Sequence, residues 1–121
     1  MKDLIISKEL ISEVLDIKLE DIVSFKMFMN ELFYYRELLP RADCQGNISK
    51  HRDSIQQSIN IYEFAFKCKE WARDKYDITI SSSLYKNYAK SWNIDKDKSY
   101  TAKTEAEVII EACEGILEQN K

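Results

Sequence analysis

The sequence has 121 residues, of which 45% are hydrophobic and 32% charged, a balance typical of one globular domain and not of a disordered chain. No run of about 18 or more apolar residues is present, and the apolar run near Met1 is too short for a secretion signal, so we expect a cytoplasmic protein without a membrane partner. The three cysteines form an odd set without close spacing, which indicates reduced thiols.

The first predicted element is a short helix over about residues 8–17, with Ser7 placed to cap its N-terminus. Pro40 ends whatever precedes it, and Gly46 follows closely, so residues 40–50 are predicted to form a loop. The residues from Ser54 to Ile59 are either a strand or the first turn of the next helix.

Residues 19–39 are predicted to form a β-hairpin. Apolar residues alternate from Val23 to Met29, an aromatic run follows, and the turn is expected at Asn30–Glu31. A helix over the same residues is the alternative, because Met, Leu and Glu favour helices intrinsically.

The most legible element is an amphipathic helix that begins after Asn60. Asn60 and Glu63 have the spacing of a capping box, and Ile59 and Phe64 that of a hydrophobic staple. Apolar residues then recur at three- and four-residue spacing, which predicts one buried stripe. The stripe consists of Ile61, Phe64, Ala65, Cys68, Trp71 and Ala72.

Three strands are predicted next, over residues 78–82, 84–94 and 99–103, with a turn at 95–98. Thr104–Glu107 forms a second capping box and opens a final helix that ends near Gln119. A glycine inside a helix costs about 1 kcal/mol relative to Ala, so Gly115 predicts close packing against a neighbour. The buried stripe of this helix is predicted to be Ala106, Ile109, Ile110, Cys113, Ile116 and Leu117.

These elements predict a single α+β domain over residues 1–121. Residues 59–121 form a helix–three strands–helix unit, in which two helices cover one face of an antiparallel sheet as a second layer. Residues 1–58 add a short helix and a β-hairpin. Trp71 and Cys113 are therefore expected to share one interior.

The net charge of −3 is unevenly distributed. Residues 84–103 carry five lysines and two aspartates, whereas residues 104–121 carry five glutamates and one lysine. Aromatic residues alternate with lysines in this basic segment, as in proteins that stack single-stranded nucleic acid on rings. The alternative is an ordinary strand with solvated lysines on one face. The candidate anion contacts are Lys86, Lys90, Lys96, Lys98 and Lys103.

The sequence lacks the groupings of reactive residues that catalysis requires. His51 is the single histidine, and its distance from Cys44 matches no zinc motif. Cys68 and Cys113 fall on helical stripes and are predicted to be core residues. The serines at 81–83 lack the flanking glycines of a nucleophile elbow, and the acids of the last helix suit a solvated face. We therefore expect no enzymatic activity, no metal and no cofactor.

The helix–three strands–helix pattern, with its last helix beginning within Ala102–Glu107, resembles the double-stranded RNA-binding domain. That resemblance implies lysines that bind phosphates at the start of this helix. The chain departs from the pattern, since it keeps only Lys103 there and continues with Glu105 and Glu107. The ending, a short sheet followed by a helix that opens with Thr and acids, also resembles the HicB antitoxins.

Four segments resemble a group of small uncharacterised bacterial proteins that prophages often carry: Asn60–Glu63, Lys67–Ala72, Thr104–Glu107 and Ala112–Leu117. The likeness covers about residues 59–120. Members of the group have a His near the position of Phe66, so no histidine chemistry is carried over. The group has no known activity, and the resemblance implies the helix–three strands–helix fold and a bacterial, prophage-type origin.

Aromatic residues make up 12% of a chain without a reactive grouping, so we expect an interaction module that binds a protein partner or a second copy, as a homodimer. Tyr and Trp suit this role because they combine contact area with a polar tip. The predicted interface residues are Tyr34, Tyr35, Tyr85, Tyr88 and Trp92. Nucleic-acid binding through residues 84–103, in a regulatory role, is the alternative.

Overall fold

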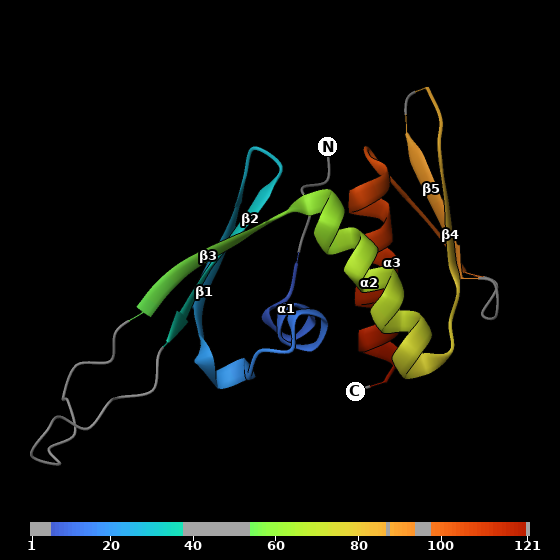
Figure 1. Ribbon diagram of the computed structural model, residues 1–121. Helices are drawn as coiled ribbons and strands as arrows, with labels where there is room; N and C mark the ends of the chain where they lie inside the picture. Colours follow the sequence, from blue (N-terminus) through green and yellow to red (C-terminus); the bar gives the residue numbers. More distant parts are fainter. Residues whose placement is uncertain (1–5, 38–53, 87, 94–97, 121) are drawn as a thin grey trace, which may run out of the picture.

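The computed structural model describes residues 6–37, 54–86, 88–93 and 98–120, and in these residues it is an α+β protein with two antiparallel sheets (Figure 1). The predicted fold class is confirmed. The predicted loop at 40–50 and most of the predicted turn at 95–98 lie outside the described residues. The elements are α1 (Lys8–Leu15), the 3-10 turn η1 (Leu19–Asp21), β1 (Ile22–Phe28), β2 (Glu31–Glu37), β3 (Ser54–Asn60), α2 (Ile61–Tyr76), β4 (Ile80–Leu84), β5 (Ala89–Asn93), β6 (Lys98–Ala102) and α3 (Glu105–Gln119).

The segment with two alternative predictions, residues 19–39, contains a hairpin and not a helix. Alternate residues of β1 and β2 face the core and meet across the strands, as in the pair Met27 and Leu32. The turn lies at Met29–Asn30, one residue earlier than predicted, and both residues have positive φ angles of 48° and 66°. This backbone matches the twist of paired strands, which explains why it is adopted although Met rarely takes such angles.

Of the two alternatives for the residues from Ser54 to Ile59, the strand is confirmed. This strand, β3, pairs with β2 along its whole length and leads directly into α2. Asn60 does cap α2, but its side-chain oxygen accepts from the Tyr62 N–H at 2.9 Å and not from that of Glu63. Ile59 and Phe64 are both buried, as the predicted staple requires.

The three predicted strands after α2 are confirmed in number and order, with shifted bounds. The strand predicted over 84–94 is divided, because the chain turns between Tyr85 and Tyr88, where the Tyr85 N–H donates to the Tyr88 carbonyl oxygen at 2.7 Å. The Thr104 hydroxyl accepts from the Glu107 N–H at 3.2 Å, so the second capping box begins α3 as predicted.

One helix, α3, occupies the middle of the sheet β4-β5-β6. It packs against all three strands, whereas α2 packs mainly on α3 and approaches that sheet at β4 (Figure 1). Three strands span about 10 Å between the outer axes, and a helix with its side chains is about 10–12 Å wide. One helix therefore covers this sheet, and the second helix overhangs its edge.

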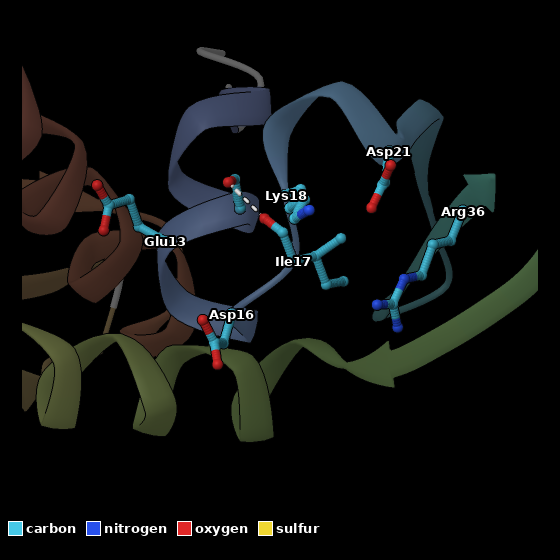
Figure 2. A pocket seen from close by; sticks show the side chains of 7 residues that line it. Glu13, Asp16, Ile17, Lys18, Asp21 and Arg36 are labelled. Carbon is cyan, nitrogen blue, oxygen red and sulfur yellow. Dashed lines mark hydrogen bonds between the residues drawn. The ribbon is translucent and has the colours of Figure 1, made fainter. Parts of the chain in front are cut away.

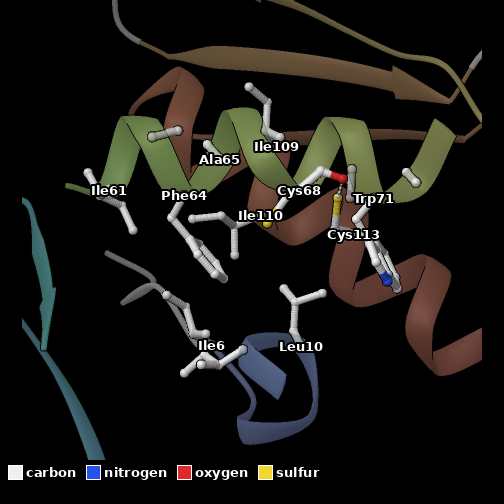
Figure 3. Close-up of a cluster of buried hydrophobic side chains, with 14 of the residues drawn as sticks. Ile6, Leu10, Ile61, Phe64, Ala65, Cys68, Trp71, Ile109, Ile110 and Cys113 are labelled. Atoms are coloured by element: carbon white, nitrogen blue, oxygen red, sulfur yellow. Dashed lines mark hydrogen bonds between the residues drawn. The ribbon is translucent and has the colours of Figure 1, made fainter. Parts of the chain in front are cut away.

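The core is continuous from α1 through α2 to α3. Phe64 of α2 and Leu10 of α1 are both fully buried in it, and Trp71 and Cys113 share this interior as predicted (Figure 3). The Ser91 hydroxyl of β5, also buried, donates to the Val108 carbonyl oxygen of α3 at 3.1 Å. This bond fixes the position of the helix along the sheet.

A second polar contact joins α3 to α1. Glu114 accepts from both the N–H and the hydroxyl of Ser7, at 2.8 and 2.9 Å, while the Ser7 hydroxyl accepts from the Leu10 N–H at 3.1 Å. The prediction that the acids of the last helix form a solvated face is therefore wrong for Glu114. A carboxylate is favourable there because the N-terminus of a helix carries partial positive charge.

Glu114→Ala should lower the free energy of unfolding by about 1–2 kcal/mol, because Ser7 loses its charged acceptor at the start of α1. Urea denaturation followed by circular dichroism measures the change. Glu70→Ala, at an exposed position of α2, is the control and should shift the same free energy by less than about 0.5 kcal/mol. Equal effects of the two substitutions would contradict a structural role for Glu114.

Gly115 packs closely, as predicted: a Cβ at this position would overlap the Tyr100 hydroxyl and lie 3.0 Å from the ring carbon Cζ. Gly115→Ala should therefore destabilise the protein by about 1–2 kcal/mol through overpacking, although Ala is the better helix former. The cost should shrink when Tyr100→Phe removes the hydroxyl. A double-mutant cycle in urea checks this, and a cost that does not change with Tyr100→Phe would contradict the contact.

Candidate interaction surface

Large apolar side chains are exposed on the first half of α2 and on the β4-β5 hairpin. The tip of this hairpin projects beyond the start of α2 (Figure 1). The exposed fractions of these side chains range from 43% to 67%. We call this set the α2/hairpin surface, and its members are Tyr62, Phe66, Leu84, Tyr85 and Tyr88.

A hydrogen bond shows how the two parts of this surface lie together. The Lys69 ammonium group of α2 donates to the Ser82 hydroxyl of β4 at 3.4 Å. Phe66 lies one turn before Lys69, and Leu84 follows Ser82 on the same face of the strand. Because α2 and β4 run in opposite directions, both steps lead toward the same end of the molecule, so Phe66 and Leu84 are displaced from this hydrogen bond in the same direction.

The tip of the hairpin carries two tyrosine rings that stack on each other. The Tyr85 and Tyr88 ring centroids are 4.8 Å apart and the rings are inclined by 20°. The backbone bond between the same two residues closes the hairpin. Each ring therefore covers one face of the other, while the remaining ring surface stays in contact with water.

The outer face of the sheet β4-β5-β6 carries Trp92 and Lys90. The Lys90 ammonium nitrogen lies 5.4 Å from the centre of the Trp92 ring, within cation–π range. Ser81 and Ser99 are directly opposite Trp92 on the neighbouring strands. The half-buried Trp92 ring is therefore covered by a lysine and is not a bare stacking platform.

The predicted lysine contacts are only partly brought together. Lys86 and Lys103 are exposed and Lys90 is half-buried on the same sheet. Lys96 lies outside the described residues, and Lys98 is described only as a backbone position in β6.

The predicted aromatic interface is divided between the two sheets. Tyr85, Tyr88 and Trp92 belong to the β4-β5 hairpin, whereas Tyr34 and Tyr35 lie in β2 of the other sheet. Tyr34 is only 9% exposed, and burial raises the pKa of its hydroxyl against the opposing effect of Arg36. The Tyr34 ring therefore belongs to the core and not to an exposed interface. Tyr35 is half-buried on the outer face of its sheet.

A cleft of about 580 Å³ lies between the end of α1, η1 and β2 (Figure 2). Its lining mixes both signs of charge, with Asp16 and Asp21 beside Lys18 and Arg36. Glu13, also in the lining, is paired with Lys75 of α2 at 2.7 Å. The described residues include no group of three His, Cys, Asp or Glu side chains that could hold a metal ion. His51 and Cys44 lie outside the described part of the chain.

Three residues of the α2/hairpin surface were missed by the sequence prediction: Tyr62, Phe66 and Leu84. A signal for two of them exists, because Tyr62 and Phe66 are spaced four residues apart and lie off the buried stripe of α2. Two such large apolar residues on the polar side of a helix indicate a second contact surface.

Comparisons with known proteins gave no match: no family model, no curated protein and no solved structure is similar to this chain at a significant level. No helix in the described part of the chain is both long enough and apolar enough to cross a membrane.

Cys68 and Cys113 are fully buried between α2 and α3, and the Cys113 thiol donates to the Cys68 carbonyl oxygen at 3.4 Å. Burial, with a smaller effect of Cys113, raises the pKa of the Cys68 thiol well above its ordinary value. The thiolate is the reactive form of cysteine, so a raised pKa means slow reaction.

Iodoacetamide should therefore leave Cys68 unmodified in the folded protein at neutral pH, and burial alone should protect Cys113, whereas both should be modified in urea. Peptide mass spectrometry reads each site separately. Rapid alkylation of Cys68 at neutral pH in the native protein would contradict its burial in a well-packed core.

Proposed function

We propose that this protein is a non-catalytic interaction module that binds another protein chain through the α2/hairpin surface. The observation that supports the proposal is the grouping of large apolar side chains on adjoining elements, each of them more than two-fifths exposed. Exposed apolar groups of this kind are unfavourable in water unless they are covered, and contiguous ones mark protein contact sites. Tyr and Phe are also the residue types enriched at the centre of such contacts.

A second candidate function is the binding of single-stranded nucleic acid on the outer face of the sheet β4-β5-β6. It is favoured by the placement of Lys90 and Trp92 on a face whose other described residues are serines and a threonine, without an acid. It is less well supported, because Lys90 covers Trp92 and the two tyrosines cover each other. Nucleic-acid affinity would fall steeply with added salt, whereas apolar protein contacts would not weaken.

Phe66→Glu and Leu84→Glu should each raise the dissociation constant for the bound chain by about tenfold or more, because a carboxylate would have to be desolvated in the contact. Sedimentation velocity over a concentration series measures association between copies of the chain. Capture of lysate proteins on the tagged chain measures association with other proteins. Leu19→Glu is the matched control, since Leu19 is 43% exposed in η1, outside this surface.

Both substituted side chains are exposed, so the free energy of unfolding should change by less than about 0.5 kcal/mol. The proposal is wrong if the chain is strictly monomeric and no captured protein is lost on substitution of Phe66 or Leu84. It is also wrong if Leu19→Glu weakens the association equally.

A further inference from the structure

β4 is an edge strand whose own sequence lacks the usual protection against pairing, although α2 overhangs this edge and its Lys69 reaches Ser82. It is the first strand in the order β4-β5-β6, and no described strand pairs with its other side. Edge strands of proteins commonly carry a charge, a proline or a bulge that prevents edge-to-edge pairing. β1 has such a bulge between Ile22 and Ser24, whereas the β4 sequence Ile-Ser-Ser-Ser-Leu is uncharged and regular.

The backbone groups on the free side of β4 follow from its pairing with β5. The Tyr85 N–H donates to Tyr88, so this pair is hydrogen-bonded across the hairpin. Hydrogen-bonded and non-bonded pairs alternate along an antiparallel ladder. Ser83 and Ser81 therefore bond to β5, while the N–H and C=O groups of Ile80, Ser82 and Leu84 face away from it.

From this geometry we infer that β4 pairs antiparallel with β4 of a second copy, about a two-fold axis at Ser82, to give a continuous six-stranded sheet. The inference rests on the proposed function and names the partner. The sequence of β4 is self-complementary about Ser82. Ser82 meets Ser82 of the second copy, Leu84 meets Ile80, and Ser81 meets Ser83. The backbone groups of Ile80, Ser82 and Leu84 face the free edge, and in this register these residues lie opposite one another. This is the arrangement that hydrogen bonding between two antiparallel strands requires.

The pairing covers apolar surface that is otherwise exposed. Leu84, the most exposed member of the α2/hairpin surface, is placed beside Ile80 of the second copy, an apolar cross-strand pair. Ile80 is already buried within its own copy, so the apolar surface that the pairing covers is that of Leu84. No charged residue of β4 is brought against another, because the strand contains none. An unrelated peptide strand would satisfy the backbone but not this apolar match at both ends, which favours a second copy as the occupant.

The same axis brings the two α2 helices together. The hydrogen bond to Ser82 places Lys69 of α2 close to the two-fold axis. The helical turn before Lys69 in one copy therefore faces the turn after Lys69 in the other copy. The two Lys69 ammonium groups approach the axis and repel each other. The dimer should therefore be stronger, not weaker, as salt is added.

Two double variants test the register directly, because Ser81 and Ser83 point away from the helices and meet across the axis. Ser81→Glu/Ser83→Glu places glutamate against glutamate at both ends of the pairing and should weaken dimerisation about tenfold. Ser81→Lys/Ser83→Glu places lysine against glutamate and should keep the dissociation constant within about threefold of the original. Both variants carry the same glutamate opposite Lys90 within the monomer, so they differ only at position 81.

Sedimentation equilibrium of the full chain gives the dissociation constants, and circular dichroism checks that both variants fold. The pairing is overturned if the unsubstituted chain is monomeric at all concentrations, or if the two double variants associate equally. Association that Phe66→Glu abolishes but the two double variants leave equal would overturn β4 pairing while leaving the proposed function intact. Association that weakens with salt would contradict the placement of Lys69 at the axis.

Discussion

The position of α3 in the middle of a three-stranded sheet determines most of what this molecule can do. A sheet of this width accommodates one helix, and α3 is that helix, with β4, β5 and β6 on one side of it and α2 beside it. The second amphipathic helix, α2, is consequently displaced to the β4 edge. Its buried stripe faces α3 and α1, and the side that faces the edge keeps Tyr62 and Phe66 in water. The exposed surface is thus a geometric consequence of the packing.

Polar contacts hold α3 in this position from two sides. The Ser91 hydroxyl fixes it to the sheet, and Glu114 fixes it to the N-terminus of α1. The hairpin β1-β2 and the strand β3 then cover the far side of α1, with Leu32 buried in the same core. The two sheets lie on opposite sides of the helices, and for this reason the aromatic residues of β2 and those of the β4-β5 hairpin cannot belong to one contact (Figure 1).

Local chemistry in the sequence predicted local structure well. The caps at Ser7 and Thr104, the stripes of both long helices and the close packing at Gly115 all depend on neighbours within a few residues. The turn at Met29 was misplaced because its positive φ is imposed by strand pairing and not by a favoured residue type. The exposed side of α2 was not predicted because both long helices are amphipathic and only one of them fits over the sheet. Hydrophobic periodicity does not predict which of the two helices packs on the middle of the sheet.

Amide hydrogen exchange at Ser82 tests most directly whether the edge left free by this packing is a contact between copies. Ser81 and Ser83 provide an internal reference, because their N–H groups bond to β5 in every state. Pairing predicts that the Ser82 N–H exchanges slowly in concentrated protein and becomes fast on dilution, while the two references stay protected. A Ser82 amide that exchanges fast at every concentration would contradict it.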